Sequence, residues 1–180
     1  VLAFNQISSL PSLCQLHKLE KLDLSVNCLE DVAFLCSEQP NVLPNLNQLY
    51  LYRNKISSLP KEFFKLTNLK TLDLMENQLS ELPPHISSLS LLQNLVLGCN
   101  RLKSIPPSIK ELTKLKKLNL FGNLLTSLPS EINSLVSLKR LVLGYNQFTT
   151  EFPLLQIYHL NEINISGNPL SSFPDFSRDR

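Results

Sequence analysis

Large apolar residues recur along the chain in a fixed order, and each copy contains one asparagine. The order is L-x-x-L-x-L-x-x-N-x-L, as between Leu115 and Leu125. A partial copy surrounds Asn5, and the asparagines that follow are Asn27, Asn54, Asn77, Asn100, Asn123, Asn146 and Asn168. Successive asparagines are 22, 27, 23, 23, 23, 23 and 22 residues apart. A period of this length predicts a solenoid of stacked coils.

Each copy contains the pattern of one short strand. The residues five and three positions before the asparagine are apolar, as Leu72 and Leu74 are before Asn77. An apolar residue at every second position predicts a strand with one face turned inward. Stacking one such strand per coil predicts a parallel sheet.

The segment between strands has a different period. A Leu-Pro or Ile-Pro pair follows four of the strands, and proline fixes an extended or turn geometry there. Beyond it, Ile109, Leu112 and Leu115 recur every three residues, which is the spacing of a short helical or 3-10 turn. We therefore expect the returning wall of each coil to contain one such turn.

Together, L-x-x-L-x-L-x-x-N-x-L and L-P-x-x-I/F-x-x-L resemble the 23-residue leucine-rich repeats of cytoplasmic scaffolds of the Scribble and Ras-pathway kind. The resemblance implies an α/β solenoid, a curved horseshoe with the parallel sheet on its concave face and short turns on its convex face. It also implies that the seven asparagines from Asn27 to Asn168 form a structural ladder, each amide bonding backbone groups of its own and the adjacent coil. We expect about eight coils over residues 1–174, cut at both ends, and a polar tail over 175–180.

Two copies depart from the frame. The copy after Asn27 is four residues longer, has Val32-Ala33 in place of Leu-Pro, and predicts an exposed bulge over 37–41. The copy after Asn146 has its proline one position later, at Pro153.

Composition and charge exclude several classes of function. The net charge of +2 is too small to argue for nucleic-acid or membrane binding, and no apolar run reaches the roughly 18 residues of a membrane-spanning helix. His17, His85 and His159 lie on outer segments of different coils without an acidic or cysteine partner at ligand spacing. We therefore expect no enzyme, metal, cofactor or small-molecule substrate.

The four glycines, each one or two residues before a ladder asparagine, are expected to serve the turn.

Cysteine usage favours a cytoplasmic protein. Cys14, Cys28, Cys36 and Cys99 lack a clustered pattern, and no C-x-x-C spacing occurs. Cys14 and Cys36 fall where other coils have core isoleucines, so we expect two buried thiols and regard a disulfide between them as the less favoured alternative.

Residues two and four positions before each asparagine must point outward on the concave face. They predict an apolar and aromatic stripe, which we define as Tyr50, Tyr52, Met75, Val96, Phe121 and Val142. Asp73 lies in the same rows, and Arg53 and Tyr145 lie at the rim. Exposed aromatic groups favour an interface with a protein partner; the alternative is a set of scattered surface apolar residues.

A basic patch is expected beside this stripe. Lys116 and Lys117 occupy the same coil positions as Lys139 and Arg140 one coil later. Stacked like charges favour an acidic partner, and the alternative is a solvated edge that keeps the solenoid soluble.

The leading functional hypothesis is a non-catalytic scaffold that binds a protein on its concave face. One alternative is the recognition arm of a larger enzyme, such as a kinase, ubiquitin ligase, Roco GTPase or phosphatase. Another is a receptor ectodomain or secreted effector.

Overall fold

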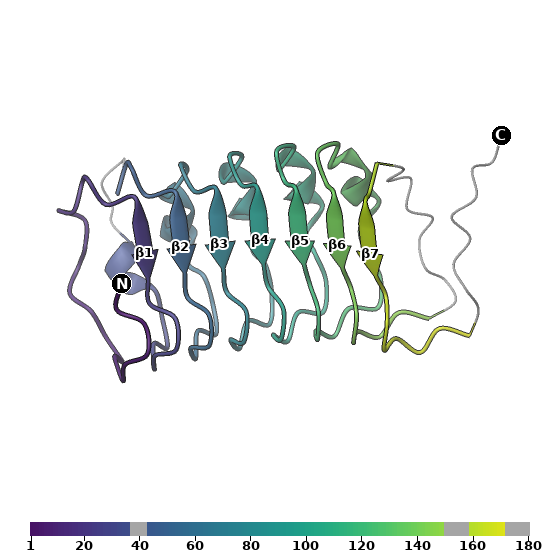
Figure 1. The fold of residues 1–180 in the computed structure, drawn as a ribbon, viewed down its shortest axis with the longest axis horizontal. Coiled ribbons are helices and arrows are strands. Elements are labelled where there is room, and N and C mark those ends of the chain that lie inside the picture. Colours follow the sequence, from purple (N-terminus) through teal and green to yellow (C-terminus); the bar gives the residue numbers. More distant parts are fainter. Residues whose placement is uncertain (37–42, 150–158, 172–180) are drawn as a thin grey trace.

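The computed structural model describes residues 1–36, 43–149 and 159–171. Seven strands form one parallel sheet in chain order (Figure 1). They are β1 (Lys21–Asp23), β2 (Gln48–Tyr50), β3 (Thr71–Asp73), β4 (Asn94–Val96), β5 (Lys117–Asn119), β6 (Arg140–Val142) and β7 (Glu162–Asn164). Each strand pairs with the next in the register that the repeat predicts, so Leu72 lies between Leu49 and Leu95. The expected bulge, Pro153 and the polar tail lie outside the described residues.

The returning wall contains short 3-10 helices, and the described residues contain no α-helix. The 3-10 helices are η1 (Ala33–Leu35), η2 (Lys61–Lys65), η3 (Pro84–Ser88), η4 (Pro107–Glu111) and η5 (Ser130–Ser134). Helices η2 to η5 each begin directly after a proline whose backbone is extended. The prediction of a turn in each returning wall is confirmed for these coils.

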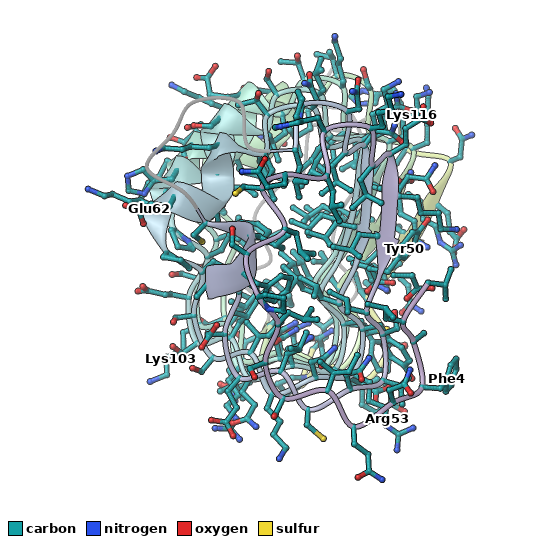
Figure 2. All side chains as sticks on the ribbon, turned by 90° about the vertical axis from the view of Figure 1, so that its left-hand side faces the viewer. Phe4, Tyr50, Arg53, Glu62, Lys103 and Lys116 are labelled. Atoms are coloured by element: carbon teal, nitrogen blue, oxygen red, sulfur yellow. The ribbon has the colours of Figure 1, made fainter. Side chains whose placement is uncertain are left out.

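The core lies between the sheet and the 3-10 helices. Figure 2 looks along the solenoid, with the sheet near Tyr50 on one side and the wall near Glu62 on the other. Leucines from both walls fill the space between and are almost fully buried, including Leu95, Leu97 and Leu112. Because each coil contacts only its neighbours, the core is continuous along the solenoid rather than concentrated at one centre.

Among the described residues, no helix is long and apolar enough to cross a membrane.

Candidate partner-binding face

The asparagine ladder fixes the backbone that supports this face. Asn123 is 5% exposed, and its Nδ2 donates to the carbonyls of Leu97, Leu120 and Phe121 at 3.0, 3.1 and 3.3 Å. Its Oδ1 accepts the N–H of Leu102 at 3.0 Å. A buried amide is stable when its hydrogen bonds are made. The predicted structural role of the ladder is confirmed, since the other asparagines from Asn27 to Asn168 repeat this pattern.

The residue directly before each of these seven asparagines has left-handed backbone. Gly122 and Gly167 have φ of 63° and 68°, which confirms that they serve the turn. The same expectation is wrong for Gly98 and Gly144, which have no positive φ. Their lack of a side chain has another cause, because a Cβ at Gly144 would lie 3.0 Å from Asn164 Oδ1.

The two predicted rows of outward residues are in register along the sheet. Tyr50 pairs with Asp73, and Asp73 pairs with Val96. The hydroxyl of Tyr50 donates to Gln48 Oε1 at 3.2 Å, and Lys21 Nζ lies 5.0 Å from the centre of its ring. A cation over an aromatic face is attractive, so part of the Tyr50 surface is already occupied by the chain itself.

Tyr52 belongs to a small polar network that the sequence analysis did not identify. Its hydroxyl donates to Glu76 Oε1 at 3.0 Å, and Arg53 Nε lies 3.9 Å from Glu76 Oε2. The hydrogen bond to Glu76 raises the pKa of the Tyr52 phenol. Glu76 therefore belongs to the candidate site, because it holds one edge of the Tyr52 ring in place.

Phe121 and Tyr145 form the most exposed aromatic pair. Their ring centroids are 5.0 Å apart at an interplanar angle of 51°, and Tyr145 is 61% exposed. A Cβ at Gly167 would lie 2.9 Å from the Tyr145 ring, so the ring lies directly over that glycine. The backbone of Tyr145 has φ of 54°, a sparsely populated conformation for a bulky residue. The backbone thus holds the aromatic ring of Tyr145 outward, just beyond the end of its strand.

The middle of the stripe differs from the prediction at one residue. Met75 and Val96 are half-buried rather than fully exposed, and Val142 is only 7% exposed. The expectation that Val142 is an open contact is wrong. It lies in register between Asn119 and Asn164, whose side chains flank it on the same face of the sheet.

Asp73 has a structural role that the sequence analysis did not assign. Its Oδ1 accepts the backbone N–H of Met75 at 3.0 Å. Burial raises the pKa of the Asp73 carboxyl, while the hydrogen bond from Met75 and the charge of Lys117 oppose that shift. The side chain therefore caps the end of its own strand.

The basic patch lies at the opposite end of the strands from Arg53, as the positions of Lys116 and Arg53 in Figure 2 show. Lys116 and Lys139 are exposed, and Lys117 pairs in register with Arg140. Arg140 Nη2 also lies 2.9 Å from Glu162 Oε1, an ion pair that the sequence analysis missed. This ion pair could have been predicted from the register of β6 and β7, because that register places Glu162 beside Arg140.

The remaining candidate groups lie away from this face. All four cysteines are free, so the alternative of a disulfide between Cys14 and Cys36 is excluded; both thiols are partly buried against the core. Burial raises the pKa of the Cys36 thiol to about 11. Within the described part of the chain, no three His, Cys, Asp or Glu side chains gather as metal ligands would.

Comparisons with known proteins agree with this architecture. The sequence profile of the leucine-rich repeat region matches residues 1–141, and a comparison with curated proteins gives no match. A leucine-rich repeat protein of Leptospira interrogans is similar in structure, with a TM-score of 0.83 and 41% identity over 90% of this chain and 41% of that one.

Two further solved structures are similar to this chain over most of its length. An internalin of Listeria monocytogenes is 27% identical, with a TM-score of 0.82 over 93% of this chain and 47% of its own. The plant peptide hormone receptor RGFR1, solved in complex with RGF2, is 28% identical, with a TM-score of 0.75 over 88% of this chain and 26% of its own. The chain spans less than half the length of each of these three proteins. With its repeat frame, its asparagine ladder and the profile match over most of its length, this chain belongs to the leucine-rich repeat family.

Proposed function

We propose that this chain is a non-catalytic binding module that holds a protein partner on its concave face. The observation that carries the proposal is the contact between the half-buried ring of Phe121 and the exposed ring of Tyr145. The core does not need these rings, because the leucines of the same coils already fill it. Rigid aromatic side chains bind partners with large contact area at low entropic cost.

The neighbouring side chains support the same face. Tyr52 is held by Glu76, and Met75 and Val96 offer half-buried apolar surface between Tyr52 and Phe121. An apolar centre with a polar rim is the usual composition of a protein interface. The plant peptide hormone receptor RGFR1, which has a similar structure, was solved in complex with RGF2.

The basic patch supports an acidic region on the partner. Lys116, Lys117 and Lys139 form no salt bridge among the described residues, whereas Arg140 is paired with Glu162. The four free thiols support a cytoplasmic location, where cysteines stay reduced.

The test is the affinity of a purified partner for matched variants. Phe121→Ala and Tyr52→Ala are each expected to weaken binding by about 1–4 kcal/mol in calorimetry, as central aromatic anchors do. Both should leave the melting temperature nearly unchanged, because neither ring fills the core. Glu111→Ala on η4 is the matched control, being an exposed residue on the convex wall.

The same assay separates the aromatic and basic contributions. Lys117→Glu with Lys139→Glu is expected to slow association and flatten its dependence on salt, with a smaller effect on dissociation. Full affinity in both aromatic variants, with loss of affinity in the η4 variant, would move the site to the convex wall and refute the proposal.

A further inference from the structure

The backbone N–H two residues before each ladder asparagine has lost its ordinary partner. At the start of the strands, the N–H of Thr71 donates to Asn47 O and that of Asn94 to Lys70 O, both at 3.0 Å. Continued in steps of two residues, this ladder would join Gly98 N to Leu74 O. Leu74 O instead accepts the Nδ2 groups of Asn77 and Asn100, at 3.1 and 2.9 Å. The asparagine ladder thus displaces one sheet hydrogen bond from every coil.

Alternate coils replace that lost bond with a side chain. The residue four positions before the ladder asparagine is Asp or Asn in the coils of β1, β3, β5 and β7. Its Oδ1 accepts the displaced N–H at 3.0 Å in all four, the pairs being Asp23 with Ser25, Asp73 with Met75, Asn119 with Phe121 and Asn164 with Ser166. These coils have no free donor at this position.

The coils of β2, β4 and β6 have no such cap. Tyr50, Val96 and Val142 occupy the capping position, and none of these side chains can accept the bond as an Asp or Asn does. No acceptor for the N–H groups of Tyr52, Gly98 and Gly144 exists among the described residues. Gly98 and Gly144 are buried residues. Because a buried N–H without an acceptor is costly and rare, these positions indicate an acceptor supplied from outside the chain.

The spacing of the free donors selects the shape of the ligand. Adjacent strands lie about 4.8 Å apart, so donors on alternate coils lie about 9.6 Å apart along the solenoid. A polyproline-II segment rises about 3.1 Å per residue with three residues per turn, and therefore presents a carbonyl to the same side every 9.3 Å or so. A fully extended strand presents one about every 6.7 Å, which does not match.

The surface between the donors also fits such a segment. Gly98 and Gly144 carry no side chain of their own beside these amides. Phe121 stands between them on β5's coil, with Tyr145 against its ring. Proline-rich segments in this conformation pack their rings on aromatic side chains.

We propose that the amides of Gly98 and Gly144, extended by that of Tyr52, bind main-chain carbonyls three residues apart in a polyproline-II segment of the partner. The segment runs along the solenoid, across the strands, and packs on Phe121. This inference rests on the proposed function and specifies which atoms of the concave face make the contact.

The experiment follows glycine amides by NMR in the whole ¹⁵N-labelled chain titrated with a blocked nona-proline peptide, which has carbonyl acceptors and no N–H donors. The chain has only four glycines, and Gly122 N already donates to Gly144 O at 2.8 Å, which makes it an internal control. Saturable shifts of Gly98 and Gly144, at least three times that of Gly122, are expected.

Matched variants test the donors themselves. Val96→Asn supplies the cap that Asn119 gives Phe121, so it should abolish the Gly98 shift; Val96→Ala removes the same side chain without adding an acceptor, so Gly98 should still respond. Val142→Asn is the equivalent variant for Gly144. Absence of saturable shifts at both glycines, equal shifts in Val96→Asn and Val96→Ala, or saturation by acetate alone would each overturn the proposal. If the glycine shifts fail while Phe121→Ala still weakens the partner, the donors are rejected and the concave face stands.

Discussion

The partly buried carboxylate of Asp73 hydrogen-bonds a backbone N–H just beyond its own strand. Asp73 caps the N–H of Met75, and Asn119 and Asn164 perform the same task two and four coils later. The cap therefore needs an oxygen acceptor but no charge. Because burial raises the Asp73 pKa, the charge is a cost that the amide at the equivalent positions avoids.

Asp73→Asn is expected to keep the cap and remove that cost. The folded-state pKa of Asp73 lies above its unfolded value, so the folded chain binds the proton more tightly and wild-type stability falls as pH rises between the two values. The variant should gain stability over the wild type through this window and lose the advantage at lower pH. Urea unfolding at a series of pH values measures the difference. Asp73→Ala, which also removes the acceptor, should be destabilised by about 1 kcal/mol. A wild-type-to-Asn difference independent of pH would contradict the assignment.

At the scale of elements, the ladder joins coils that strands alone would join weakly. Each strand has only three residues, but each asparagine adds bonds to its own coil and to the coil before it. Asn100 bonds the carbonyls of Leu74, Leu97 and Gly98 and accepts the N–H of Leu79. The same bonds create the free amides of alternate coils, so the stability of the sheet and the candidate donors have one origin.

Asn100→Ala is expected to destabilise the chain by about 1–3 kcal/mol, because it leaves buried backbone groups without partners. Asn161→Ala is the matched control, since this exposed asparagine makes a backbone hydrogen bond and no side-chain hydrogen bond to the described residues. Asn164, although on the outward face of its strand, is unsuitable as a silent position because its Oδ1 accepts from Ser166. Equal denaturation midpoints for Asn100→Ala and Asn161→Ala would show that the ladder contributes little.

At the scale of the whole molecule, the solenoid separates its surfaces. The 3-10 helices form one wall, and the strands form the other (Figures 1 and 2). Along the strand wall, Tyr52, Phe121 and Tyr145 follow the ends of their strands, whereas the basic patch lies at or just before the starts of β5 and β6. Caps alternate with free amides along the strand wall. Because of this alternation, the proposed binding amides repeat once every two coils, whereas the sequence pattern repeats once every coil.

The repeat frame predicts the strands, their register and the ladder because these depend on residues at fixed short spacings. The buried state of Val142, the ion pair of Arg140 with Glu162 and the role of Glu76 depend on side chains meeting across coils. The frame places those residues but does not fix their rotamers or partners. The caps could have been predicted from the sequence, since Asp or Asn occurs at the same position in every second coil.

Hydrogen exchange of the chain with and without its purified partner tests most directly whether the concave face is the binding surface. The amides of Gly98 and Gly144, which have no internal acceptor among the described residues, should gain protection on binding, together with those around Phe121. The amides of η2 to η5 should exchange at unchanged rates. Protection confined to η2 to η5, with Gly98 and Gly144 exchanging as in the free chain, would contradict the account.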